Sequence, residues 1–203
     1  MRIFNLFALI SEDSSDATCL QVLIRRIEDE KYNGNVRNRT KVIKKGYTGC
    51  AEMLRKGTAQ LKSNIQMGAK FLIICIDQDS FSKAERINLV NDKVISNLNL
   101  NANIKIQIIV PTEELEAWIL ADPSCLTKVF SSWRNPPDYP RPESVSQPKE
   151  ILIRASRDVN NRSRPLYSNA THNEKLFEKI DISLIRKKCP SFDEFYTFVY
   201  TNI

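Results

Sequence analysis

The chain has a single histidine, His172, and no two of its five cysteines form a CxxC pair. A structural zinc site needs several Cys or His ligands at short spacings, so we expect none. The cysteines are odd in number and lie scattered in apolar contexts, which indicates a reducing compartment. We therefore expect a cytoplasmic protein.

Long hydrophobic runs are missing as well. The partly apolar start, residues 1–10, is short and is followed at once by Glu12, Asp13 and Asp16, which predicts neither a signal peptide nor a membrane span. Positive charge is only mildly in excess: the chain has 30 Lys and Arg residues and 24 Asp and Glu residues, which gives a net charge of +6. That excess is compatible with a polyanionic partner. A length of 203 residues suffices for one domain with a helix-covered core.

Apolar runs alternate with amphipathic stretches over the first 110 residues. The segments 3–10, 36–43, 71–76 and 104–110 have the composition of buried strands. Amphipathic stretches follow the first three strands, and Asp13 is placed to cap the first helix, with Asp16 three positions on. This alternation predicts an α/β fold with a mainly parallel four-stranded sheet flanked by helices.

The residues after 110 do not continue this alternation of apolar runs and amphipathic stretches. We expect a helix over 112–120 with Thr112 as its cap, and Asp122 as a further helix cap. Five prolines mark 131–148 as an irregular connecting segment. Short helices are predicted over 149–156, 173–180 and 191–200. We therefore divide the chain into a core (1–130), a proline-rich connection (131–148) and a helical extension packed on the core (149–203).

Two carboxylates follow the third predicted strand, in Phe71-Leu-Ile-Ile-Cys-Ile-Asp77-Gln-Asp79. Residues two apart in an extended chain project to the same side, so Asp77 and Asp79 can converge at the ligand-binding edge of the sheet. Glu12 follows the first strand and joins them if the two strands are neighbours. Because adjacent carboxylates repel, the group predicts a divalent cation, Mg²⁺ or Mn²⁺. Alternatively, Asp77 and Asp79 form a surface turn and Glu12 stabilises a helix N-terminus.

Basic residues gather in two places, around 37–45 and beyond the proline-rich segment. Such groups can follow a phosphate backbone through salt-sensitive contacts, although a charged run can equally be solvated surface. The candidate nucleic-acid contacts are Arg37, Arg39, Lys41, Lys44, Lys45, Arg154 and Arg157.

Several stretches resemble a known pattern. Leu9-Ile-Ser-Glu12-Asp-Ser-Ser-Asp16 and the Asp77-Gln-Asp79 strand resemble the TOPRIM pattern, in which one strand ends in glutamate and a later one in D-x-D. Asp13 replaces the glycine that usually follows the glutamate. Pro111-Thr-Glu-Glu-Leu-Glu116-Ala-Trp118-Ile-Leu-Ala-Asp122 resembles the signature of a small TOPRIM-like family, similar to OLD nucleases and commonly encoded beside ABC-type ATPases in bacterial defence systems.

The resemblance implies a divalent-metal-dependent nuclease acting on DNA or RNA, an effector of anti-phage defence with an ATPase partner. Asp77 and Asp79 would hold magnesium, and Glu12 would act in proton transfer or as a further ligand. Glu113 or Glu116 could bind a second metal, or lie solvated in a first helical turn. Lys149 could neutralise charge on the transition-state phosphate. Trp118 is expected in the core.

Two alternatives come from other functional classes. The first is a non-catalytic adaptor or sensor subunit that binds the ATPase. The second is a phosphotransfer protein similar to a response-regulator receiver. A receiver places a lysine at the end of a later strand, whereas Lys105 begins the fourth predicted strand. The sequence therefore favours the nuclease or the adaptor.

Overall fold

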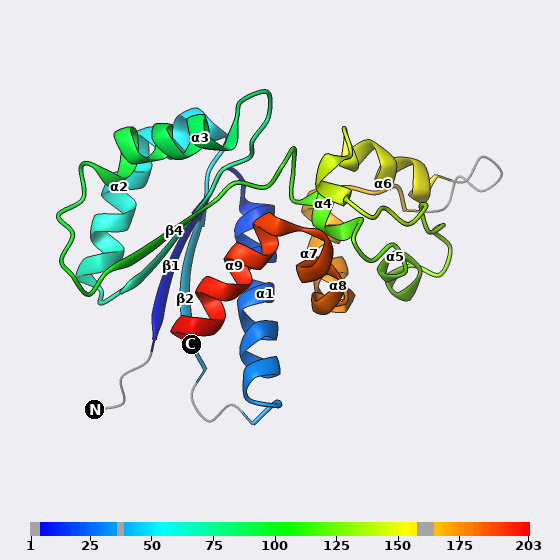
Figure 1. The fold of residues 1–203 in the computed structure, drawn as a ribbon, viewed down its shortest axis with the longest axis horizontal. Coiled ribbons are helices and arrows are strands. Elements are labelled where there is room, and N and C mark those ends of the chain that lie inside the picture. The colour runs from blue at the N-terminus through cyan, green and yellow to red at the C-terminus, as the bar shows by residue number, and fades with distance from the viewer. Residues whose placement is uncertain (1–4, 36–38, 158–164) are drawn as a thin grey trace.

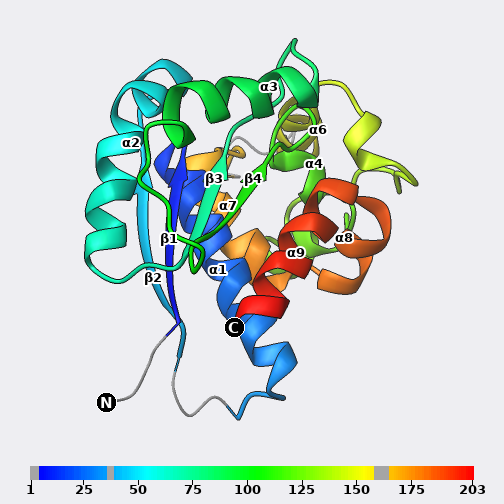
Figure 2. The same ribbon diagram turned by 60° about the vertical axis from the view of Figure 1, so that its left-hand side comes forward.

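The computed structural model describes residues 5–35, 39–157 and 165–203. Its four strands form one parallel sheet (Figure 1), and their order, β2-β1-β3-β4, can be followed in Figure 2. The strands are β1 (Leu6–Ser11), β2 (Lys41–Gly46), β3 (Phe71–Cys75) and β4 (Lys105–Ile109). The predicted α/β fold is confirmed, and β1 and β3 are neighbours at the centre. Ser11 pairs with Cys75, so the chain leaves both strands at the same edge.

Helices cover both faces of the sheet (Figure 2). α1 (Ser14–Lys31) and α9 (Pro190–Asn202) lie on one face, whereas α2 (Cys50–Gln66) and α3 (Lys83–Val90) lie on the other. A π-helical turn, Asn91–Ile95, continues α3. Because strand side chains alternate, each face has its own buried core: Phe7, Leu9, Ile73 and Ile109 toward α1, and Ala8, Ile10, Leu72 and Ile74 toward α2.

Gly57 shows how closely α2 approaches the sheet. A Cβ atom at this buried position would lie 3.0 Å from Cδ1 of Ile10 and 3.5 Å from Cγ1 of Val94. Glycine lowers helix propensity, so the benefit of this residue is the close packing that it permits.

The smaller helices extend away from the sheet on the side of α1 (Figure 1). They are α4 (Glu116–Ile119), α5 (Cys125–Val129), a 3₁₀ turn (Pro142–Ser144), α6 (Pro148–Ser156), α7 (Asn169–Lys179) and α8 (Ile182–Lys188). α7 packs against α1, whereas α5 and α6 lie farther out (Figure 1). Trp118 of α4 is fully buried against Phe177, Phe192 and Phe195, so it is a core residue as expected. One buried cluster joins these aromatic rings to Phe7 and Leu9 of the sheet. The helical extension and the sheet therefore share a core.

Some predicted boundaries were wrong. The second strand begins at Lys41 instead of residue 36, and residues 36–38 lie outside the described ranges. The helix expected over 112–120 is only the four residues of α4. Glu113 adopts φ 64°, and the carbonyl of Pro111 accepts a bond from the N–H of Gln78, so the chain after β4 stays irregular. Asp122 caps no helix; it accepts the N–H of Asp181 across the fold.

Two short helices, α5 and α8, were not predicted, and α7 begins at Asn169 rather than at residue 173. Over the parts of the chain that the structure describes, no helix combines the length and the apolarity needed to cross a bilayer.

Candidate functional site

Glu12 lies directly after β1, where the connections following two neighbouring strands meet. Its Oε1 accepts a hydrogen bond from the backbone N–H of Asp77 at 3.1 Å, and its carbonyl accepts one from Gly49 at 2.9 Å. A Cβ atom on Gly46, the last residue of β2, would lie only 2.3 Å from the carbonyl oxygen of Asp13. The absence of a side chain at Gly46 therefore lets this connection pack directly on the residues that follow Glu12.

Within the parts of the chain that the structure describes, Asp77 carries a buried polar atom that lacks a partner, as does Tyr47 directly after β2. Its Oδ1 is buried and has no hydrogen-bond partner among the described residues. Burial raises the pKa of Asp77 well above its usual range, and the nearby negative charges of Asp16, Glu12 and Glu116 raise it further. A buried carboxylate in this state needs either a proton or a cation.

Asp16 is a member of the site that sequence reasoning missed. Its backbone N–H donates to Oδ1 of Asp13, which confirms Asp13 as the cap of α1, but its own side chain is buried. Burial and the charges of Asp13 and Glu116 raise the pKa of Asp16 to about 8. The available signal was helical spacing, because Asp16 stands four residues before Leu20 on the apolar face of α1.

Glu116, the first residue of α4, is buried rather than solvated. Its Oε1 accepts hydrogen bonds from the hydroxyl of Tyr167 at 2.8 Å and from Nδ2 of Asn173 at 3.1 Å. Both donors belong to the helical extension and were not predicted. Its charge raises the pKa values of Asp16 and Asp77, which places Glu116 near both carboxylates.

Asp79 is held by Arg86, although its charge still contributes to the raised pKa values of Glu12 and Asp77. It adopts φ 49° and forms an ion pair with Arg86, a buried residue of α3. β3 ends at Cys75, so Asp77 and Asp79 do not project together from an extended strand as predicted. The same guanidinium donates to the carbonyl of Gln78 at 3.2 Å and lies 4.5 Å from the ring centre of Phe81. Arg86 therefore anchors the loop that follows β3.

Four carboxylates thus form an acidic cluster, Glu12, Asp16, Asp77 and Glu116. Within residues 5–35, 39–157 and 165–203, no three Asp, Glu, His or Cys side chains converge tightly enough to form a ready metal cage. The donor chemistry nevertheless suits a hard divalent cation, because every candidate ligand is a carboxylate oxygen. The unpartnered Oδ1 of Asp77 fits such an ion.

Lys149 lies beside Glu114, whose charge contributes to the raised pKa of Asp16. It is the second residue of α6, and its backbone N–H bonds to Glu114. Burial raises the pKa of Glu114, an effect that the charge of Lys149 partly offsets. Lys149 is therefore a neighbour of Glu114, and its action on a phosphate stays a prediction.

The other predicted basic residues are spread over two regions. Lys44 and Lys45 lie near the carboxyl end of β2, where Lys44 donates to Thr18 of α1 at 2.7 Å. Arg39 pairs with Asp29 at 2.8 Å and Glu28 at 3.6 Å. Lys41 begins β2, Arg154 and Arg157 are exposed at α6, and Arg37 lies outside the described residues.

Comparison with known proteins identifies a family. The model of DUF4276, a domain of unknown function, matches residues 11–199. No curated protein and no solved structure matches the chain. The matched span includes the whole acidic cluster and extends from the end of β1 into α9. The chain therefore belongs to the DUF4276 family.

Proposed function

We propose that this protein is a divalent-metal-dependent nuclease that hydrolyses phosphodiesters of DNA or RNA. The observation that carries the proposal is the acidic cluster at the carboxyl edge of a parallel sheet, with a buried Asp77 oxygen that lacks a partner. Buried carboxylates that raise one another's pKa destabilise a fold, and such groups concentrate at functional sites. The edge itself is where open α/β sheets bind ligands.

The side chains suggest distinct roles. Asp77, together with Asp16 or Glu116, would hold Mg²⁺ or Mn²⁺ with waters as the other ligands, and the metal when bound activates water and stabilises the leaving oxygen. Burial raises the pKa of Glu12, so this carboxylate is suited to accept a proton from an attacking water. Lys149 would stabilise negative charge on the phosphate. Asp79, paired with Arg86, would fix the loop that carries Asp77 or become a ligand if that pair opens.

The test is incubation of the purified protein with plasmid, single-stranded DNA and RNA in Mg²⁺ or Mn²⁺. We expect cleavage that EDTA stops and that Asp77→Asn abolishes. Asp92→Asn serves as the matched control, because Asp92 is an exposed acid on the π-helical turn. Metal-dependent cleavage that survives Asp77→Asn would contradict the proposal.

The expectations of a cytoplasmic location, an anti-phage role and an ABC-type ATPase partner stay predictions, as do the TOPRIM resemblance and the adaptor alternative. Co-expression with a neighbouring ATPase distinguishes the two functions. A nuclease cleaves alone or once its partner is bound, whereas an adaptor co-purifies and never cleaves.

A further inference from the structure

A groove of about 610 Å³ runs along β2, the outermost strand on one side of the described sheet. We call it the β2-edge groove. Its cationic lining comes from Arg25 of α1, Arg39 and Lys41, and its apolar lining includes Val42, Ile43 and Met67. Met67 is 56% exposed, so its apolar side chain is accessible to a ligand in the groove.

The charge of this groove has one sign. None of the described residues that line it is acidic, and the two acids nearest to Arg39 are those with which it pairs, Glu28 and Asp29. A lining of this kind favours a polyanion over a neutral or cationic ligand.

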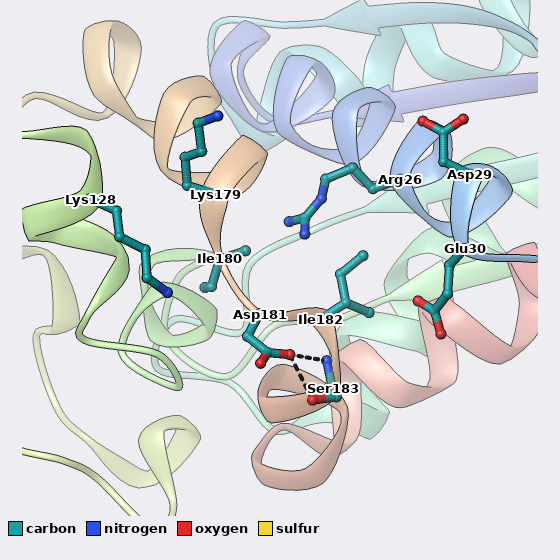
Figure 3. A pocket seen from close by; sticks show the side chains of 9 residues that line it. All are labelled: Arg26, Asp29, Glu30, Lys128, Lys179, Ile180, Asp181, Ile182 and Ser183. Carbon is teal, nitrogen blue, oxygen red and sulfur yellow. Dashed lines mark hydrogen bonds between the residues drawn. The ribbon is translucent and has the colours of Figure 1, made fainter. Parts of the chain in front are cut away.

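A second cavity, of about 630 Å³, provides a contrast (Figure 3). Its three cations, Arg26, Lys128 and Lys179, are balanced by Asp29, Glu30 and Asp181. Asp181 accepts hydrogen bonds from the N–H and the hydroxyl of Ser183, and Glu30 accepts one from Tyr196. A cavity with balanced charge has no comparable preference for a polyanion.

The β2-edge groove leads toward the acidic cluster. β2 is parallel to β1, and Lys44 and Lys45 pair with Leu9 and Ile10, shortly before Glu12. Six residues of strand span about 20 Å, the distance over which several phosphates of an extended strand can be laid. Along β2, Lys44 lies between the residues that line the groove and the edge where the carboxylates lie.

We infer that the β2-edge groove holds one strand of a single-stranded polynucleotide and guides it to the acidic cluster, an inference that rests on the proposed nuclease function. Arg25, Lys41 and Lys44 would contact phosphates. Val42, Ile43 and Met67 would contact unpaired bases, which a duplex keeps stacked inside. A single strand thus matches both linings, as in other grooves that combine cations with apolar base contacts.

The experiment measures binding without cleavage. In the full chain carrying Asp77→Asn, a fluorescein-labelled single strand of about 12 nucleotides is titrated by anisotropy at several salt concentrations. Arg25→Gln and Lys41→Gln should each lower the salt slope by about 0.7, which corresponds to about eightfold weaker binding near 0.05 M salt. The matched controls are Lys62→Gln on α2 and Lys179→Gln in the charge-balanced cavity, and both should bind as the parent does.

Each outcome decides one question. Two results would overturn the groove proposal. One is that the groove variants bind as tightly as the two controls, and the other is that a duplex binds more tightly than the single strand. Cleavage is scored separately with Asp77 intact. If the protein cleaves but the groove variants bind as the controls do, the nuclease proposal stands and the groove proposal is wrong. If the groove variants bind more weakly than the controls but the protein never cleaves, the groove proposal is supported and the nuclease proposal is wrong. Circular dichroism of every variant shows that binding losses do not come from unfolding.

Discussion

The carboxylate of Glu12 accepts a hydrogen bond at 3.1 Å from the backbone N–H of Asp77, which is 65 residues further along the chain. This bond joins the ends of the two central strands. It also brings the charge of Glu12 close enough to raise the pKa of Asp77. The metal-free protein therefore holds mutually repelling acids together, and the packing around them must offset that repulsion.

Replacing Asp77 by Asn should stabilise the metal-free protein. In EDTA we expect a gain of roughly 1–3 kcal/mol in the free energy of unfolding, and the gain should grow as the pH rises, because burial raises the pKa of Asp77 and makes its ionised form costly. Mg²⁺ at about 100 times its Kd should stabilise the parent by about 2.7 kcal/mol and the variant far less. Urea unfolding with and without Mg²⁺ measures both effects. An Asp77→Asn protein less stable than the parent in EDTA would contradict this reading.

The pKa of Asp16 predicts a pH-dependent stability. Its folded-state value is about 8, above the usual 3.8, so the folded protein binds this proton more tightly than the unfolded chain. The contribution is fully present below about pH 4 and is lost as the pH rises through about 8, at about 1.4 kcal/mol per pH unit for one proton. Metal-free unfolding of Asp16→Asn should lack this decline, whereas Asp92→Asn should retain it.

Arg86→Lys should loosen the loop after β3 although it keeps the charge. Lysine cannot reach the carbonyl of Gln78, the carboxylate of Asp79 and the thiol of Cys50 together, as the guanidinium does. We expect a loss of about 1.5–3 kcal/mol and faster hydrogen exchange in residues 77–82. Arg55→Lys, at an exposed position of α2, is the control. Unchanged exchange in that loop would show that Arg86 does not anchor it.

Tyr167→Phe tests the support of Glu116. The variant leaves the buried Oε1 of Glu116 with Asn173 as its remaining side-chain donor, at a cost of about 1–3 kcal/mol. Tyr200→Phe, at a residue that is 39% exposed, should change stability by less than about 0.5 kcal/mol. A double-mutant cycle with Asn173→Ala should show coupling, because both donors share one oxygen. Additive losses would place the two donors in separate interactions.

Much of the fold was predictable because its signals are local. Continuous apolar runs identified the strands, and the spacing of Leu20, Leu23 and Ile27 identified the buried face of α1. Glu12 and Asp77 met as expected because their strands are neighbours. The second strand was placed too early because the lysines of β2 dilute its apolar pattern on an exposed edge.

The parts of the site that escaped prediction depend on distant contacts. Asp16 resembled a capping residue, and its spacing from Leu20 placed it on the apolar face of α1 without showing which carboxylates lie around it. Asp79 was expected beside Asp77, but Arg86 holds it in a left-handed conformation. The donors to Glu116 lie 51 and 57 residues away from it, beyond the reach of any pattern in the local sequence.

The two donors to Glu116, Tyr167 and Asn173, affect how this fold can be passed on by gene fusion or recombination. A fragment ending after β4 would keep Glu12, Asp16 and Asp77 but would lose Glu116 along with the two side chains that support it. It would also uncover Phe7 and Leu9, whose core continues into α9. Gene fusion or recombination can therefore carry this sheet with its complete acidic cluster only together with the helices that follow β4, from α4 to α9.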